Sequence, residues 1–310
     1  MISLLQVLKF HGKTGDNTMA DKNYLHTAYA YSADGTDRFT TTYPNLNLLV
    51  NSSAKTKDGF FKNFDKVENG YGEVTLKGTN ISDSRDLSDG FSIKPRDYKP
   101  GDKYTMSMDV MLTSWNLPAG TTVTEFWFGQ RYTQSSDGTI MSYKPICFID
   151  LPKNPSGMLN QWIRITQTST ILPYEDPSVN TQTAFQAKFT GASEGSITFR
   201  VRKPKQEPGS TATPYMPSSS EVTTADWPKY VGTYVDTNPV SSTDPSKYVW
   251  DEMKYRVYLD GVPVGGSKLL SFDLENLKAG TTYNVQVSQI NGNIESDKSE
   301  SIAFKTTLTQ

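Results

Sequence analysis

The stretch YTMSMDVML, residues 104–112, decides the fold class of this chain. Apolar side chains occupy every second position, namely Tyr104, Met106, Met108, Val110 and Leu112. The positions between them include Thr105, Ser107 and Asp109. Because successive side chains of a strand point to opposite faces of a sheet, this alternation predicts a strand with one buried face.

The same alternation recurs between about residues 45 and 218, and helical periodicity is nearly absent from the chain. The other predicted strands of this region are Glu73–Lys77, Glu125–Thr133, Tyr143–Leu151, Trp162–Ser169, Ala184–Phe189 and Ser196–Arg202. Gly, Pro, Asn, Asp or Ser residues bound these strands, as is typical of sandwiches with buried inner faces. The number and spacing of the strands predict an all-β protein in which residues 45–218 form a jelly-roll β-sandwich.

A second region follows the segment Glu207–Pro217, whose Pro and Gly residues end the sheet. Short strands are predicted there at Tyr230–Val235, Tyr248–Trp250, Tyr255–Leu259, Leu269–Leu274, Thr282–Ser288 and Ile302–Thr306. The sequences YRVYLDG at 255–261 and LKAGTTYNVQV at 277–287 resemble the later half of a fibronectin type III domain. The early strands of such a domain are missing in front of them.

Half a sandwich would leave an apolar face and an open sheet edge in water, so the missing strands must come from elsewhere in the chain. The remaining candidates are the segments 24–31 and 230–235. We therefore expect residues 24–44 and 219–310 to build one fibronectin type III-like or immunoglobulin-like β-sandwich. The jelly roll at 45–218 would then be inserted into it, since compact domains tolerate insertion at exposed loops.

Residues 1–23 are expected to form an N-terminal arm. Its run Ile2–Phe10 is apolar and too short to fold alone. Two interpretations remain open: the run docks on a neighbouring chain, or it packs on the second domain of its own chain.

Composition narrows the classes of partner. Thirty-one Lys and Arg residues against 33 Asp and Glu residues give a net charge of −2, which argues against dedicated nucleic-acid binding. The apolar runs are far shorter than the ~20 residues that span a bilayer, so membrane insertion and a conventional export signal are not expected. The single cysteine, Cys147, excludes an internal disulfide.

Three stretches carry a resemblance to a known family: YLHTAYAYSADG at 24–35, YPNLNLL at 43–49 and SEVTTADWPKYVGTY at 220–234. They resemble tail and baseplate proteins of phages that infect lactococci, lactobacilli and related Gram-positive bacteria. In size and layout the chain is similar to the accessory baseplate proteins of lactococcal siphophages. The resemblance implies a virion protein of the tail baseplate, with a carbohydrate-binding module that interrupts a structural module. It also implies an upper baseplate protein and a receptor-binding protein as partners.

Saccharides are bound by flat aromatic rings and by planar polar groups, so the strand EFWFGQRY at 125–132 holds the candidate site. If Phe126 and Phe128 face the core, Trp127 and Arg131 stand on the opposite face, with Gly129 leaving room between them. The alternative is that a loop buries Trp127 and that Arg131 is merely solvated.

Three further residues would complete this carbohydrate-binding site if their strands are neighbours of that strand. They are Asp109, Arg200 and Trp115, the last of which is expected to lie in the loop after Leu112. We expect no catalytic residue, no metal ligand and no cofactor. A structural calcium ion bound through backbone oxygens stays open, because the sequence does not reveal such ligands.

We thus expect a non-catalytic baseplate protein that binds host cell-wall polysaccharide through the jelly roll and docks to other baseplate proteins through the fibronectin-like domain. The first alternative is an architectural spacer that binds no glycan. The second is a cell-wall glycosidase, since a suitably spaced pair among the 33 acidic residues would suffice for that chemistry.

Overall fold

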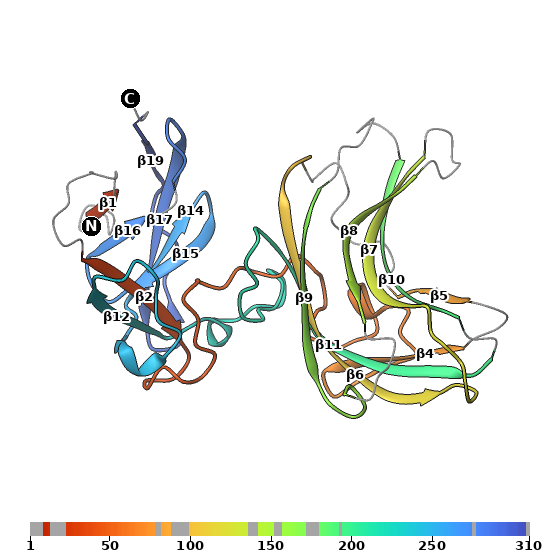
Figure 1. Ribbon diagram of the computed structural model, residues 1–310. Coiled ribbons are helices and arrows are strands. Elements are labelled where there is room, and N and C mark those ends of the chain that lie inside the picture. Colours follow the sequence, from red (N-terminus) through yellow and green to blue (C-terminus); the bar gives the residue numbers. More distant parts are fainter. Residues whose placement is uncertain are drawn as a thin grey trace. The chain divides into compact units, whose positions relative to one another are not determined.

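The computed structural model describes residues 9–12, 23–77, 82–87, 99–135, 142–151, 157–171, 180–191, 194–274 and 277–307. Contacts divide the chain into two compact units (Figure 1). Leu46–Val222 form one unit, called here the central domain. Met1–Asn45 and Thr223–Gln310 form the other, called here the terminal domain because it contains both chain ends.

The structure is all-β, so the predicted fold class is confirmed. The strands of the central domain are β3 (Lys66–Glu68), β4 (Tyr71–Lys77), β5 (Ser82–Asp86), β6 (Lys103–Asn116), β7 (Glu125–Ser135), β8 (Ser142–Asp150), β9 (Ile163–Thr170), β10 (Asn180–Thr190) and β11 (Ser196–Pro208). Those of the terminal domain are β1 (Lys9–Gly12), β2 (Tyr24–Ala30), β12 (Tyr230–Asp236), β13 (Val249–Glu252), β14 (Tyr255–Leu259), β15 (Val262–Ser267), β16 (Ser271–Leu274), β17 (Thr282–Asn291), β18 (Ile294–Glu295) and β19 (Ile302–Lys305). Among the described residues the helices are short 3-10 turns, η1 (Gly59–Phe61), η3 (Thr224–Asp226) and η4 (Pro245–Lys247), and none of them could span a membrane.

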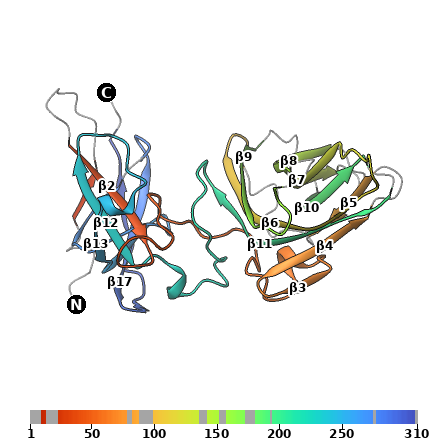
Figure 2. The ribbon, with the colours of Figure 1, turned by 60° about the horizontal axis from the view of Figure 1, so that its bottom comes forward.

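The central domain is a sandwich of two antiparallel sheets (Figure 2). One sheet has the strand order β3-β4-β11-β6-β9 and the other has the order β5-β10-β7-β8. Strands β6 and β11 form the centre of the first sheet, and their register aligns Val201 with Val110 and Arg202 with Asp109. Each strand thereby presents one apolar row to the opposite sheet and one polar row to the outside.

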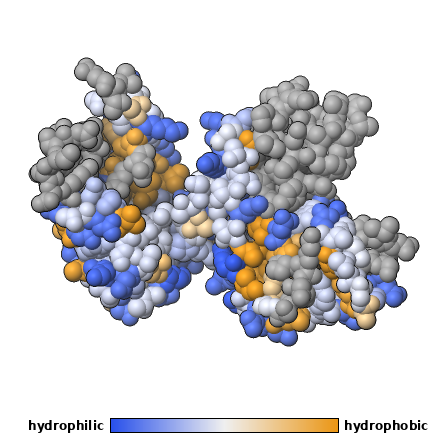
Figure 3. Space-filling view, viewed as in Figure 1, coloured by the Kyte–Doolittle hydropathy of each residue, from blue (hydrophilic) through white to orange (hydrophobic). Residues whose placement is uncertain are grey.

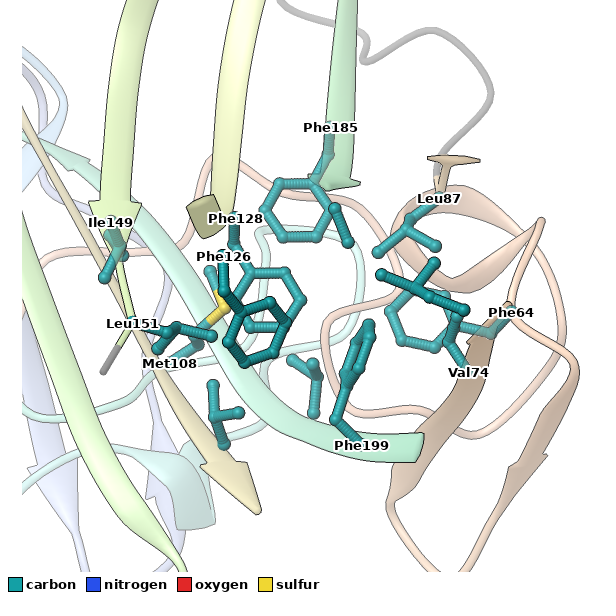
Figure 4. Close-up of a cluster of buried hydrophobic side chains, with 14 of the residues drawn as sticks. Phe64, Val74, Leu87, Met108, Phe126, Phe128, Ile149, Leu151, Phe185 and Phe199 are labelled. Carbon is teal, nitrogen blue, oxygen red and sulfur yellow. The ribbon is translucent and has the colours of Figure 1, made fainter. Parts of the chain in front are cut away.

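The core between the two sheets is rich in phenylalanine (Figure 4). Phe126, Phe128, Phe185 and Phe199 are all at most 1 % exposed. The ring centroids of Phe128 and Phe199, which come from opposite sheets, lie 4.6 Å apart in an edge-to-face arrangement. Burying one such side chain contributes about 1.5–3 kcal/mol, so this cluster accounts for a large part of the stability of the domain.

The chain enters and leaves the central domain at one place. Asn47 and Ser218 pair as an isolated parallel bridge. The side chain of Asn47 donates to the carbonyl of Pro204 over 2.7 Å and accepts from the backbone N–H of Gln206 over 3.0 Å. The incoming and outgoing segments are therefore fastened to β11 and to each other, which is the geometry that an inserted domain requires.

In the terminal domain, a three-stranded sheet has the order β13-β12-β2. Its register places Val231 opposite Tyr29 and Thr233 opposite Thr27, so a strand from the beginning of the chain pairs with one that follows the inserted domain. A second sheet contains β15, β14 and β17, with β18 and β19 paired to β17. Strand β1 pairs in parallel with β16.

Strand β15 was not expected from the sequence. Its residues, VPVGGS at 262–267, contain Gly265 and Gly266, which break the alternation. A Cβ atom on Gly265 would lie 2.3 Å from the ring of Phe272 and 2.8 Å from the hydroxyl of Tyr29. The glycine is needed for this close approach. Because it has no side chain, it also interrupts the alternation from which a strand would be predicted.

Candidate functional site

The outer face of the β3-β4-β11-β6-β9 sheet carries two arginines stacked on two aromatic rings. The guanidinium carbon of Arg200 lies 4.5 Å from the ring centre of Tyr71. That of Arg202 lies 4.1 Å from the ring centre of Trp162. The two rings are themselves neighbours, with centroids 6.3 Å apart. Arg200, Tyr71, Trp162 and Arg202 thus form a continuous row, called here the stacked row.

Two carboxylates hold the arginines of the stacked row in place. Arg200 Nε donates to Glu73 over 2.6 Å, and Arg202 Nε donates to Asp109 over 3.0 Å. The hydrogen bond to Glu73 raises the pKa of Arg200, against the opposing effect of burial. Arg200 therefore remains charged and oriented at any physiological pH.

Asp109 is the centre of this charge network and is 13 % exposed. Its other carboxylate oxygen accepts from Arg164 NH1 over 3.1 Å. Arg164 in turn donates to the hydroxyl of Ser107 over 2.8 Å and to the carbonyl of Lys203 over 2.9 Å. A planar hydrogen-bonding surface is thereby organised before any ligand arrives.

The chemistry of this face suits a neutral or weakly anionic ligand that presents both C–H surfaces and hydroxyl groups. The rings offer apolar area, and the guanidinium and carboxylate groups offer donors and acceptors. Three arginines and Lys66 against Glu68, Glu73 and Asp109 leave a small local excess of positive charge. Because each side chain already has a partner, the binding free energy of a ligand would come mainly from displacing water from a preformed surface.

The structure brings two of the five predicted binding residues to this face, Asp109 and Arg200. Trp115 is not among them. It packs against the core between the sheets, with its ring 5.9 Å from that of Phe126 in an edge-to-face contact. Strand β6 continues to Asn116, so Trp115 lies in a strand rather than in the expected loop.

Trp127 lies on the other sheet. Its neighbours Phe126 and Phe128 point into the core, so Trp127 faces outward as expected, but it is only 8 % exposed. Its Nε1 donates to Glu125 over 2.6 Å, and Glu125 also pairs with Lys188 over 2.8 Å. Burial works to raise the pKa of Glu125, but the hydrogen bonds from Lys188 and Trp127 outweigh it and lower that pKa.

Arg131 of β7 is the register partner of Ala184 of β10. Its side chain is not among those that the structure describes. The five residues therefore do not form one site. Alternation within a strand fixes the face on which a side chain lies, but not the sheet to which the strand belongs. Here β7 belongs to one sheet and β6 and β11 belong to the other.

The pattern analysis missed Trp162, Tyr71, Arg202, Arg164 and Glu73. The signal for two of them was present, since Trp162 is in phase with Arg164, and Ile163 and Ile165 pack against the core. The stacking of arginines on rings across several strands has no signature in the sequence. Among the described residues, no group of His, Cys, Asp and Glu side chains could hold a metal ion.

His26 makes a second polar cluster in the terminal domain. Its Nε2 bonds to Asp236 over 2.9 Å, its Nδ1 bonds to Ser241 over 3.0 Å, and its ring stacks on Tyr234. The side chain is 3 % exposed and links β2 to the end of β12 and to the chain that follows it. We interpret this histidine as structural.

Each of the two domains contains a stretch that matches a known protein family. Residues 56–204 match a family described as BppA domain 1. Residues 228–286 match a family described as the C-terminal domain of minor structural protein 5-like proteins. No relative was found among curated proteins.

Among solved structures, the chain is similar to one from the tripod (BppUct-A-L) of the baseplate of bacteriophage Tuc2009. The two sequences are 78 % identical, the TM-score is 0.86, and the match covers 94 % of this chain and 100 % of that chain. A CBM4 structure matches at 16 % identity and a TM-score of 0.27, over 46 % of this chain and 74 % of the other. A carbohydrate-binding module of the β-sandwich superfamily matches at 12 % identity and a TM-score of 0.29, over 60 % of this chain and 74 % of the other.

Proposed function

This chain belongs to the family of accessory baseplate proteins of lactococcal siphophages, and we propose that it binds host cell-wall saccharide through the stacked row of its central domain. It is a component of the phage tail baseplate and carries a carbohydrate-binding-module-like domain. The proposed activity is recognition without bond cleavage.

The observation that carries this proposal is the stacked row itself. Arg200 on Tyr71 and Arg202 on Trp162 put two half-buried rings and two oriented guanidinium groups on one sheet face. Each cation–π contact contributes about 0.5–1 kcal/mol at an exposed position, so the row is stable enough to be preformed. A sugar ring can lie against such a surface and exchange its hydroxyl hydrogen bonds from water to the flanking charges.

A single site of this kind binds weakly. Each hydroxyl exchanges one set of hydrogen bonds for another, and the open face leaves much of a ligand in water. Many copies on one virion compensate by raising the effective concentration of the sites near the cell wall. The proposal therefore concerns adsorption by avidity.

Retention on purified host cell walls tests the proposal. Trp162→Ala and Arg202→Ala should each raise the Kd of the purified full chain for the walls by about tenfold, the ratio that 1.4 kcal/mol gives, and so reduce the retained fraction. The matched control is Arg38→Ala, which removes an arginine 3.4 Å above the ring of Tyr31 and paired with Asp37, in the terminal domain. Arg38→Ala should bind like the parent.

Each other outcome has a clear meaning. If the Trp162 and Arg202 variants are retained like the parent, the stacked row is not the binding face. Trp127→Ala then tests the outer face of the other sheet, where the candidate Trp127 lies. If the parent itself shows no retention, the architectural alternative is favoured. Release of reducing sugar from the walls would instead establish a glycosidase.

We further propose that the terminal domain docks this chain to other baseplate proteins. The 78 % identical chain belongs to a tripod of baseplate components, which supports docking to an upper baseplate protein and proximity to a receptor-binding protein. Co-elution of the full chain with the upper baseplate protein tests this. The Trp162 and Arg202 variants should keep this association, because the stacked row belongs to the central domain.

A further inference from the structure

The terminal domain contains an open groove of about 480 Å³, lined by both apolar and polar side chains. Residues of β2 and β12 form one side, and residues of β14, β15 and β16 form the other. Its apolar lining includes Leu25, Val231, Leu259, Val264, Leu269 and Phe272. In Figure 3 hydrophobic residues gather on the surface over β14 and β15. The lining side chains therefore leave the space between the two sheets of this domain unfilled.

One buried cluster of the terminal domain consists of Val257, Leu274 and Val285. By contrast, Leu25 is 43 % exposed and Leu269 is 58 % exposed, although both line the groove. Apolar side chains of a sandwich that remain this accessible mark a surface that another segment or molecule covers.

Strand β1 shows how the beginning of the chain reaches the groove. Phe10 is the register partner of Phe272 and Lys9 is the partner of Ser271, in parallel orientation. Both Ser271 and Phe272 line the groove. The backbone at Lys9 is therefore fixed at the groove wall, and the residues directly before it start from that wall.

The eight residues before Lys9 have the sequence MISLLQVL. They carry no charged side chain, and Ile2, Leu4, Leu5, Val7 and Leu8 are apolar. If they continue the parallel register of β1, Leu8 and Val7 come beside Leu270 and Leu269. These two leucines are 42 % and 58 % exposed, so such a continuation would cover them.

We propose that residues 1–8 fill this groove of their own chain, cover its apolar side chains and complete the core of the terminal domain. The occupant is the same chain rather than a second copy, because β1 is paired with β16 of its own chain and the segment continues from that strand without a linker. The N-terminal segment is then a part of the terminal domain and does not bind to a neighbouring baseplate protein.

Photo-crosslinking of the full-length protein tests the location of the segment. A benzophenone amino acid at position 4 should form crosslinks to peptides that line the groove, 25–43, 231–241 and 259–274. Mixing ¹⁵N-labelled with unlabelled protein before irradiation separates crosslinks within a chain from crosslinks between copies. Crosslinks within one chain to the groove support the proposal. Crosslinks between copies, crosslinks elsewhere, or none at all overturn it.

Stability supplies the second readout. The double variant Leu4→Ser/Leu8→Ser should lower the melting temperature of the terminal domain by about 4 °C or more and should increase the fluorescence of an apolar dye severalfold. The matched control is Gln6→Ser, which changes a polar side chain of the same segment and should change neither. If the double variant behaves like the control, the segment does not occupy the groove.

Discussion

Arg256 donates a hydrogen bond from Nε to the hydroxyl oxygen of Tyr43 over 2.9 Å, although 213 residues separate them along the chain. Trp227 completes the contact, since its ring stacks on that of Tyr43 and lies 4.6 Å from the guanidinium carbon of Arg256. Glu295 forms an ion pair with the same guanidinium. This buried cluster joins the segment before the inserted domain to strands that follow it, and thereby makes the two chain ends one folding unit.

Removal of the Tyr43 hydroxyl should destabilise the terminal domain. Tyr43→Phe leaves a buried guanidinium donor without its acceptor, which costs about 1–3 kcal/mol of unfolding free energy. Calorimetry of the full chain measures this as a lower melting temperature of one transition. Tyr230→Phe, at a half-buried tyrosine of the same domain, should have little effect. Equal shifts for both variants would contradict the role assigned to Tyr43.

The buried ion pair of Lys205 and Glu207 should respond differently to single and double replacement. Both side chains are 0 % exposed, and their charged atoms are 3.1 Å apart. Lys205→Met leaves the buried side chain of Glu207 without the lysine ammonium, so it should destabilise the central domain by about 3–5 kcal/mol. Lys205→Met/Glu207→Leu should recover only part of the loss in chemical denaturation, because the buried backbone N–H of Thr213 then loses its Glu207 acceptor. A double variant as unstable as the single one would show that the pair itself is stabilising.

The same lysine predicts a pH dependence. Burial lowers the pKa of Lys205 from 10.5 to about 8, although Glu207 opposes the shift. Between about pH 8 and 10.5 the unfolded chain then binds the proton that the folded chain has lost, so stability of the central domain rises with pH in this window. Denaturation at pH 8 and pH 10 should show the rise in the parent and not in Lys205→Met. The expectation fails if stability is flat or if the variant shows the same rise.

The terminal domain should show the opposite trend at higher pH. Burial raises the pKa of Tyr43 from 10.0 to about 12, against the influence of Arg256. The unfolded chain loses the tyrosine proton near pH 10 while the folded chain retains it, so stability falls between about pH 10 and 12. Tyr43→Phe should have a shallower fall in the same titration, followed by calorimetry. A parent and a variant with the same slope would exclude Tyr43 as the cause.

Substitutions at Gly191 and Gly209 should distinguish the stability cost of backbone strain from the cost of steric crowding. Gly191 and Gly209 have φ values of +102° and +95°, but a Cβ atom on Gly191 would lie 2.3 Å from the carbonyl oxygen of Thr122, whereas nothing lies within 4 Å at Gly209. Gly209→Ala should cost about 1–2 kcal/mol for the left-handed conformation. Gly191→Ala should cost about 1–3 kcal/mol more, because the Thr122 backbone must shift. Equal melting temperatures for the two variants would contradict this difference.

Particular residues show where prediction from the sequence ended. Alternation in residues 104–112 identified β6, and the same rule correctly placed Phe126 and Phe128 in the core. The rule does not reveal that β7 and β6 belong to different sheets. The prediction therefore placed Trp127 and Asp109 in one carbohydrate-binding site. It also missed β15, because Gly265 and Gly266 admit a neighbouring ring and carry no side chain that could alternate.

The sequence by itself determined the strand periods, the inward-facing rows and the family, because each depends on residues that are near one another along the chain. Only the tertiary structure decided which polar rows share a face, and it brought Arg200, Tyr71, Trp162 and Arg202 into one row. The physical reason is that strand order depends on the packing of the whole core. Contacts between side chains of separate strands leave no local pattern from which they could be predicted.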